Sequence, residues 1–315
     1  MALRARSRDR AATAGPKLTL GPVLFHWEAG RWRDFHFKIA DEAPVDAVCI
    51  GEVVCAKRAP FIAPHLAAVI ERLRAAGKQV VLSTPALVMG EREMALLRDA
   101  AEVARSENLL LEANDLAAVA AFKERAFVVG PTVNVYNEGT LAWLARRGAV
   151  RACLPPELTG RTVAALAAAS PIEIEVFAFG RAPLALSARC YHARARGLSK
   201  DGCQFVCADD PDGMTVDTLA GQPFLAVNGI QTLSHVWTCL VGAVDELRQA
   251  GVARLRLSPQ GVDMVAVARV FRDAIESRCD GDEAAARIAG LTPAAECSDG
   301  FWRGRPAAPA VAMAE

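Results

Sequence analysis

The sequence predicts an α/β fold, and within that class a TIM-barrel-like (β/α) barrel. Short aliphatic runs alternate with longer amphipathic stretches from residue 18 to about residue 180, a pattern typical of βα units around a parallel sheet. Eight such runs can be counted along the chain, which is the strand number of this barrel. The length of 315 residues also lies within the usual range of a single barrel domain.

The expected strands are rich in Val, Leu, Ile and Phe, which favour strands when turn-forming residues bound them. They are residues 18–25, 46–52, 79–84, 109–113, 126–130, 149–154, 172–179 and 253–258. The stretches between them carry apolar residues at three- and four-residue steps, which predicts helices. These helices are expected at residues 63–78, 92–107, 139–148, 161–170 and 262–278.

An open doubly wound sheet would give the same local pattern, so motifs must separate the two architectures. No G-x-G-x-x-G follows the first expected strand, and the sequence contains no P-loop motif. Because open α/β sheets commonly carry one of these motifs, the barrel is the favoured architecture.

The regular alternation stops after the seventh strand, where a small antiparallel insertion is expected at about residues 181–235. Short alternating runs lie there, separated by turns rich in Gly, Asp and Pro. They are QFVCAD (204–209), MTVDTLA (214–220) and PFLAVNG (223–229). A helical pattern resumes at residues 235–251. We expect one barrel domain over residues 18–302, with disordered ends at 1–17 and 303–315.

Composition argues against nucleic acid and membranes as partners. Lys and Arg together number 36, as do Asp and Glu, so no global field favours an anionic surface. The N-terminal residues lack the apolar segment of a secretory signal, and no apolar run is long enough to span a bilayer. We therefore expect a cytoplasmic protein, in which grouped cysteines are more often ligands than disulfides.

Four of the nine cysteines are grouped in a way that predicts a metal site. Cys55 follows the second expected strand, and Cys190, Cys203 and Cys207 form a C-x12-C-x3-C pattern after the seventh. Because these strand ends share the C-terminal face of a barrel, the four thiols are expected to converge there. Four thiolates suit an iron–sulfur cluster, whereas structural zinc sites usually use tighter cysteine pairs. Zinc and simple core packing stay open as alternatives.

The other five cysteines lack this grouping, and we leave them out of the site. Cys49 and Cys153 fall inside apolar strands and Cys239 inside an expected apolar helix, where a thiol packs as a small apolar group. Cys279 and Cys297 stand alone in the sequence.

Polar side chains at the expected strand ends are candidates for substrate contact or proton exchange. They are Glu52, Asn114, Asn134, Asn137 and Glu157. The alternative is ordinary capping of turns and helices. Glu175 lies inside the seventh strand and points to the same side as Glu173, so inside a barrel it needs an Arg or Lys partner.

Cationic residues flank the four grouped cysteines. They are Lys57, Arg58, Arg189, Arg194, Arg196 and Lys200. Such cations would stabilise a negatively charged cluster or recognise a dicarboxylate, and the alternative is a solvated loop. His192 is a further candidate for a supporting contact.

Five segments together resemble the collagenase-like peptidase family of unassigned catalytic type, over roughly residues 18–300. They are GEVVCAKR (51–58), EAND (112–115), NVYN (134–137), PPELT (155–159) and FAFGRAPLALSARC (177–190). The cysteine spacing is similar to that of the ubiquinone-biosynthesis branch of this family. Peptidase chemistry is not expected, because H-E-x-x-H and G-x-S-x-G are absent.

The resemblance implies a [4Fe–4S] cluster bound by Cys55, Cys190, Cys203 and Cys207. It also implies an iron–sulfur subunit of an O2-independent hydroxylase for ubiquinone precursors, working as a heterodimer with the homologous subunit UbiU. Prephenate is the implied hydroxyl donor, and a lipid-binding accessory protein is implied to deliver the precursor. Two other functions stay open: a non-catalytic scaffold or electron-transfer subunit of that complex, and a zinc-stabilised barrel of peptidase type.

Overall fold

We describe the protein from a computed structural model, in which residues 15–122 and 125–306 are described. Most of the two ends that we expected to be disordered therefore lies outside the described residues. The first strand begins at Lys17.

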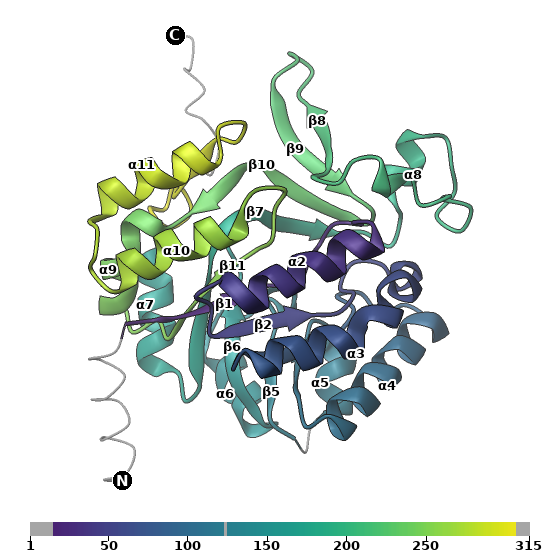
Figure 1. Cartoon of the computed structure of the whole chain (residues 1–315), viewed down its shortest axis with the longest axis horizontal. Coiled ribbons are helices and arrows are strands. Elements are labelled where there is room, and N and C mark those ends of the chain that lie inside the picture. The colour runs from purple at the N-terminus through teal and green to yellow at the C-terminus, as the bar shows by residue number, and fades with distance from the viewer. Residues whose placement is uncertain (1–14, 123–124, 307–315) are drawn as a thin grey trace.

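Eight parallel strands close into a barrel, which confirms the predicted fold (Figure 1). They are β1 (Lys17–Leu20), β2 (Ala47–Ile50), β3 (Gln79–Ser83), β4 (Leu110–Ala113), β5 (Phe127–Val129), β6 (Ala149–Leu154), β7 (Glu173–Leu186) and β11 (Arg254–Leu257). Strand β11 closes the ring because it pairs with both neighbours, with Arg254 beside Lys17 of β1 and beside Glu175 of β7. An open sheet would leave two of these edges unpaired.

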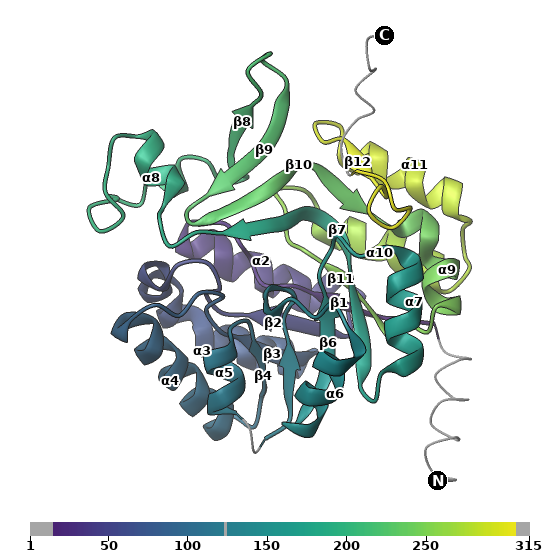
Figure 2. The same ribbon diagram turned by 180° about the vertical axis from the view of Figure 1, so that it is seen from behind.

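Helices surround the barrel and connect its strands (Figures 1 and 2). They are α2 (Ala29–Glu42), α3 (Ala59–Ala75), α4 (Glu91–Ser106), α5 (Leu116–Ala121), α6 (Glu138–Arg146), α7 (Gly160–Ala169), α9 (Val244–Gln249), α10 (Met264–Ile275) and α11 (Gly281–Leu291). Side chains of the preceding residue cap several of them, as Thr159 caps α7 and Asp263 caps α10. The expected helical stretches at residues 63–78, 92–107, 139–148, 161–170 and 262–278 correspond to α3, α4, α6, α7 and α10.

The apolar core is mainly the layer between the barrel and its helices. It contains fully buried side chains such as Leu18, Ile39 and Phe271. A much smaller apolar group, Cys49 and Val81 with a third strand residue, lies apart from this layer. Strand residues alternate between these two environments, because successive side chains point to opposite faces of a sheet.

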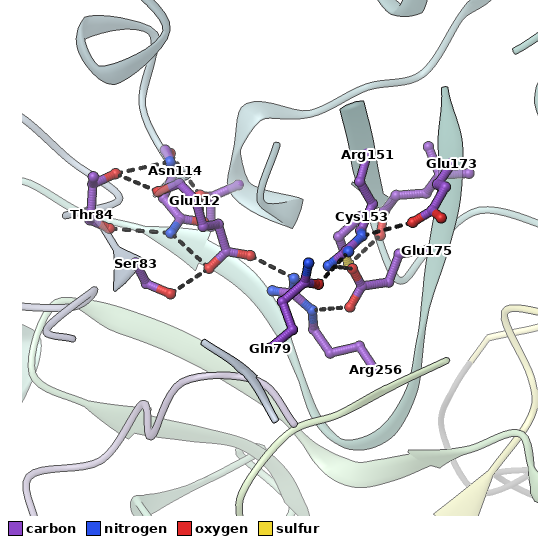
Figure 3. A network of polar contacts seen from close by, with 12 residues as sticks. Gln79, Ser83, Thr84, Glu112, Asn114, Arg151, Cys153, Glu173, Glu175 and Arg256 are labelled. Atoms are coloured by element: carbon purple, nitrogen blue, oxygen red, sulfur yellow. Dashed lines mark hydrogen bonds and ion pairs between the residues drawn. The ribbon is translucent and has the colours of Figure 1, made fainter. Parts of the chain in front are cut away.

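Charged side chains occupy the barrel interior (Figure 3). Arg256 Nε donates to Glu175 Oε1 at 2.8 Å, and its Nη2 lies 2.5 Å from Glu112 Oε1. Arg151 Nε donates to Glu173 Oε2 at 3.1 Å. The expectation that Glu175 needs a basic partner is confirmed, and that partner is Arg256.

Strand β7 runs beyond the barrel wall and carries the inserted segment. An antiparallel extension follows the order β7-β10-β9-β8 and projects from the barrel together with α8 (Figure 2). Its elements are α8 (Tyr191–Ala195), β8 (Met214–Asp217), β9 (Pro223–Asn228) and β10 (Gln231–Cys239).

Two expectations for this region were wrong. Residues 204–209 form turns and the short 3₁₀ helix η3 (Val206–Ala208) rather than an extended run, because Gln204 and Phe205 take positive φ angles of 48° and 55°. Residues 235–239 belong to β10 rather than to a helix. Val236, Trp237 and Thr238 are β-branched or aromatic, and Trp237 finds a partner in the extended part of β7.

The last described segment, residues 292–306, folds back along β10 as a strap that we call the C-terminal strap. It contains the two-residue strand β12 (Cys297–Ser298), which pairs in parallel with β10 (Figure 2). Trp302 of the strap lies against Gly160, at the start of α7. Within the described residues, no helix has both the length and the apolar character needed to cross a membrane.

Candidate functional site

The first part of the site is the loop that follows β2. Cys55 immediately precedes the short helix η1 (Ala56–Arg58). The buried carboxylate of Glu52 fixes this loop, because its Oε1 accepts hydrogen bonds from the backbone N–H groups of Val54 at 2.8 Å and Cys55 at 2.9 Å. Burial raises the pKa of Glu52 above its usual value, although the nearby Arg58 opposes this shift. Glu52 is thus a positioning residue for Cys55.

The second part comes from the insertion after β7. Cys190 caps the N-terminus of α8, where its Sγ accepts a hydrogen bond from the N–H of Ala193 at 3.5 Å. Cys203 precedes η3, and Cys207 lies within it. The tight backbone at Gln204 and Phe205 brings these last two cysteines together.

The two parts meet around one cavity, which the four grouped thiols line. Residues on its wall come from η1, α8, η3 and the β9–β10 turn. They are Cys55, Lys57, Arg58, Cys190, His192, Lys200, Cys203, Phe205, Val206, Cys207, Gly229 and Ile230. The structure therefore brings together the four cysteines that the spacing predicted, from chain segments far apart in sequence.

Two cations of η1 reach the thiols. Lys57 Nζ donates to Cys203 Sγ at 3.1 Å and also to the carbonyl of Lys200. Burial alone would raise the pKa of Cys203, but the N–H of Phe205 and the ammonium of Lys57 together lower it below its usual value. These two groups therefore stabilise the thiolate of Cys203 relative to its thiol.

Arg58 is the second cation, and only 2% of its surface is exposed. It lies beside Cys55 and Cys207, where burial raises both thiol pKa values and the guanidinium opposes the rise. Arg58 Nη2 donates to Asn228 Oδ1 at 2.7 Å. The same asparagine donates through Nδ2 to the carbonyl of Cys207 at 3.2 Å.

Asn228 was missed by the sequence analysis, although it connects the cation to the insertion. A signal was present, because Asn228-Gly229 is the dipeptide that marks a tight hairpin between two strands. Gly229 has a φ of +66°, and a Cβ atom at this position would lie 2.5 Å from Arg58 Nη2. The turn therefore needs glycine both for its backbone and for the space that Arg58 fills.

His192 is also on the wall of the thiol cavity. Its side chain is fully buried and its Nε2 lies 2.8 Å from Asp210 Oδ2. Arg196 Nη2 donates to the same carboxylate oxygen at 3.1 Å. The side chains of Arg189 and Arg194, in contrast, make no hydrogen bond or ion pair within the described part of the chain.

The lining suits a group of negative charge. Three of the lining residues, Lys57, Arg58 and Lys200, are cationic, and no carboxylate lines the cavity within the described ranges. No three Cys, His, Asp or Glu side chains among the described residues are arranged to hold a single metal ion. A cubane places different demands on its ligands, because each thiolate binds a different iron and the sulfurs stand around a volume rather than a point. Four thiols around one cavity with a cationic wall fit such a group.

A second cavity lies at the mouth of the barrel. Its wall is mainly apolar, with Val54, Phe177 and Leu186 among its residues, and Asn114 and Arg256 supply polar atoms. The loop after β2 contributes to both cavities, because Val54 lines the mouth cavity and the next residue, Cys55, lines the thiol cavity. Residues after strand ends thus build two adjacent cavities on the C-terminal face.

A wider groove continues from this mouth cavity. Asn134, Tyr136 and Glu157 line it, and the phenolic O–H of Tyr136 donates to Glu157. Burial and this carboxylate raise the pKa of Tyr136 to about 12. Asn137 instead caps α6 through a hydrogen bond from Thr140 N–H at 2.9 Å, so the capping alternative holds for it.

The remaining sequence candidates divide between the mouth and the barrel interior. Asn114 Nδ2 donates to the carbonyl of Thr84 at 3.1 Å and to Glu112 Oε2 at 3.3 Å, which ties the mouth to the interior charges (Figure 3). Glu175 lies among those charges. Cys49 and Cys153 are fully buried, and burial raises their thiol pKa values.

Comparison with known proteins gives one family match and several solved structures. The structure of tryptophan synthase from M. tuberculosis in its open form aligns at 15% identity and a TM-score of 0.42, covering 90% of this chain and 97% of that one. Phospho-2-dehydro-3-deoxyheptonate aldolase from Thermotoga maritima aligns at 10% identity and a TM-score of 0.40, covering 90% of this chain and 72% of that one. The family model that matches describes peptidase family U32, and it covers residues 31–311. That match includes the barrel strands from β2 onward and all nine cysteines.

Proposed function

This chain belongs to peptidase family U32, and we propose that it is an iron–sulfur subunit of an O2-independent ring hydroxylase acting on ubiquinone precursors. In this proposal it represents the UbiV branch of the family. The proposed ligands of a [4Fe–4S] cluster are Cys55, Cys190, Cys203 and Cys207.

One observation carries the proposal: the four grouped thiols line a single cavity whose other polar wall groups are mainly cationic. A cubane with four thiolate ligands is negatively charged, and its potential depends on charge and hydrogen bonds around the sulfurs. Lys57 supplies a hydrogen bond to Cys203 Sγ, and Arg58 supplies a buried charge beside Cys55 and Cys207. The ligand arrangement around a volume also favours a cluster over zinc, which draws its ligands to one point.

The mouth cavity supports an aromatic substrate. Its wall is mainly apolar, which suits a ring, and Asn114 and Arg256 are among its polar residues. When bound, the cluster would supply one-electron chemistry beside this cavity. The residues of this chain would orient the ring and exclude water. No histidine lines the mouth cavity or the groove among the described residues, so neither offers a serine–histidine pair for peptidase chemistry.

The proposed enzyme needs partners. Ring hydroxylation changes the substrate by two electrons, so a second redox centre on a homologous subunit is a natural requirement. We propose UbiU as that subunit, prephenate as the hydroxyl donor, and a lipid-binding accessory protein that delivers the precursor. Co-expression of the two chains should then give a stable one-to-one complex, whereas this chain alone should be poorly soluble or self-associated.

Metal analysis of protein purified without oxygen tests the cluster. We expect brown protein with about four iron and four sulfide per chain. Replacing any of Cys55, Cys190, Cys203 or Cys207 with Ala should remove most of the iron. Matched controls are Cys153→Ala and Cys279→Ala, which should keep it. Colourless protein containing zinc would contradict the proposal, as would iron loss in the controls alone.

Activity is tested by combining this chain with UbiU, prephenate and a ubiquinone precursor under strict anaerobiosis. Hydroxylated product should require both chains, and cysteine substitutions in one chain at a time show which site is needed. Full activity of the complex with a cluster-free form of this chain would assign it a scaffold role. A monomer that hydroxylates the precursor unaided would contradict the heterodimer.

A further inference from the structure

Two cysteines outside the thiol cavity meet where the C-terminal strap joins the barrel extension. Strand β12 pairs in parallel with β10, which places Cys297 directly beside Trp237. The backbone N–H of Trp237 donates to the carbonyl of Glu296 at 2.8 Å and fixes this register. Cys239 is two residues further along β10.

The strand geometry turns both thiols to the same face. Residues two apart on a strand share a face, so Cys239 points to the side of Trp237 and therefore to the side of Cys297. Cys239 and Cys297 are therefore diagonal neighbours on one face of the paired strands. The Cys239 and Cys297 side chains face each other, and both cysteines are half-buried rather than sealed in the core.

The two sulfurs have different reactivity. The neighbouring Cys239 side chain lowers the pKa of Cys297, and the Thr292 hydroxyl at 3.8 Å from its sulfur acts in the same direction. The same contact, with burial, raises the pKa of Cys239. Because the thiolate is the reactive form, this difference in pKa favours Cys297 as the nucleophile of the pair.

We propose that Cys239 and Cys297 form an oxidant-modifiable pair that a hydroperoxide converts into a disulfide. The Cys297 thiolate attacks the peroxide oxygen, the O–O bond breaks, and a sulfenic acid forms on Cys297 while the alcohol or water leaves. The Cys239 sulfur then attacks the Cys297 sulfur, the S–O bond breaks, and water leaves with the thiol proton. In total, two thiols lose two electrons to one peroxide.

This disulfide would lock the C-terminal strap to β10. In the reduced chain the strap is held by the short β10–β12 pairing and by Trp302, whose Nε1 donates to Glu246 Oε2 at 3.0 Å. A covalent link at Cys297 removes the freedom of the strap to separate from the barrel extension. The inference does not depend on the cluster, because neither cysteine lines the thiol cavity.

The experiment treats the full-length chain, purified without oxygen, with one equivalent of hydrogen peroxide and then blocks free thiols with N-ethylmaleimide. Chymotrypsin cleaves after Trp237 and so separates Cys239 from Cys203 and Cys207. Mass spectrometry without reductant should show the Cys239 and Cys297 peptides joined, and dithiothreitol should release them. Amide hydrogen exchange over residues 295–302 should slow several-fold in the oxidised form.

Two variants assign the roles. In Cys239→Ser, Cys297 should stop at a sulfenic acid that dimedone traps, whereas in Cys297→Ser, Cys239 should stay unmodified. The internal control is Cys279, a half-buried thiol whose pKa burial raises, which should oxidise more slowly than Cys297. The proposal is overturned if the joined peptides do not form while Cys279 is oxidised, or if Cys239 oxidises equally fast without Cys297. Unchanged exchange in the oxidised strap would overturn the locking role.

Discussion

Lys57 Nζ lies 3.1 Å from Cys203 Sγ, although 146 residues separate the two in sequence. The contact joins the loop after β2 to the insertion after β7. Arg58 and Asn228 make a second link of the same kind across 170 residues. The thiol cavity therefore forms only when the barrel is closed and the insertion is docked on it, so contacts around the cavity affect both folding and ligand retention.

The first prediction concerns the hydrogen bond from Lys57. Lys57→Met keeps most of the side-chain length but removes the charge and the donor, so the thiolate of Cys203 loses its stabilising partner. Iron bound to the anaerobic protein should be lost to a chelator several-fold faster than in the unchanged chain. Arg194→Met, an exposed cation of α8, is the matched control and should release iron at the unchanged rate. Equal rates in all three proteins would contradict a role for Lys57.

The second prediction concerns the turn at Gly229. Gly229→Ala adds a Cβ atom 2.5 Å from Arg58 Nη2 and must displace the guanidinium from Asn228. Gly221→Ala is the matched control, because its φ of +75° carries the same backbone strain of about 1 kcal/mol with no atom within 4 Å of the new Cβ. Chemical denaturation should show a larger loss for Gly229→Ala, together with lower iron content. Similar losses of stability and iron in the two variants would contradict the prediction.

The sequence was sufficient for the barrel because its information is local. Each of the eight strands begins within one residue of its predicted start, although β1 ends at Leu20 rather than at residue 25 and β7 continues to Leu186 rather than ending at residue 179. The helix expected at residues 235–251 was wrong in its first part. Val236 and Trp237 lie in β10, where pairing with β7 determines their extended conformation despite the helical spacing of their apolar side chains. Helix α11 was not predicted, since its apolar face is short and only Ala284 and Ile288 are buried.

The candidate site was predictable to the extent that residues following the strands of a barrel share its C-terminal face. That rule placed Cys55 and the C-x12-C-x3-C segment on one face, and the structure brings all four thiols to one cavity. The contacts that support the site could not be predicted by this rule. The Arg58–Asn228 hydrogen bond and the pairing of Arg256 with Glu175 each join residues more than 80 positions apart in the sequence. Neither can therefore be predicted from local sequence patterns.

The third prediction concerns the charges inside the barrel. Arg256→Met leaves the carboxylates of Glu112 and Glu175 buried without their main countercharge, so we expect a loss of about 3–5 kcal/mol in unfolding free energy. The matched control is Arg98→Met, which breaks an exposed ion pair with Glu91 and should cost less than about 1 kcal/mol. Urea denaturation at neutral pH measures both. Comparable losses of unfolding free energy in the two variants would contradict a special contribution of the interior ion pairs of Arg256.

The fourth prediction is a pH dependence that arises from His36. Its ring is fully buried in α2, and burial lowers its pKa from 6.5 to about 4, although the hydrogen bond to Trp32 O opposes the shift. Between those values the unfolded chain binds a proton that the folded chain does not, so this stabilisation is complete above about pH 6.5 and is lost as the pH falls toward 4. The loss is on the order of 3 kcal/mol.

Comparison with His36→Gln isolates this term from the carboxylates that titrate in the same range. The difference in unfolding free energy between the unchanged chain and His36→Gln should be constant above pH 7. It should then shift by about 3 kcal/mol against the unchanged chain on acidification to pH 4. Two curves that stay parallel down to pH 4 would show that His36 does not titrate in this way.

The last prediction concerns how the insertion depends on its ligand. Around the cysteines, residues 187–213 contain only α8 and η3, and side-chain hydrogen bonds from η1, β9 and Trp27 hold them to the rest of the fold. Among these contacts are the bonds from Lys57 to Cys203 and from Asn228 to the Cys207 carbonyl. Metal binding that joins Cys55 to this segment adds directly to folding free energy.

Limited proteolysis should therefore cut cluster-free protein more readily at residues 185–210 than the loaded protein. The hairpin of β8 and β9 provides the internal control and should be cut equally in both forms. Equal cleavage at residues 185–210 would mean that the loop is fully folded before any cluster binds to it.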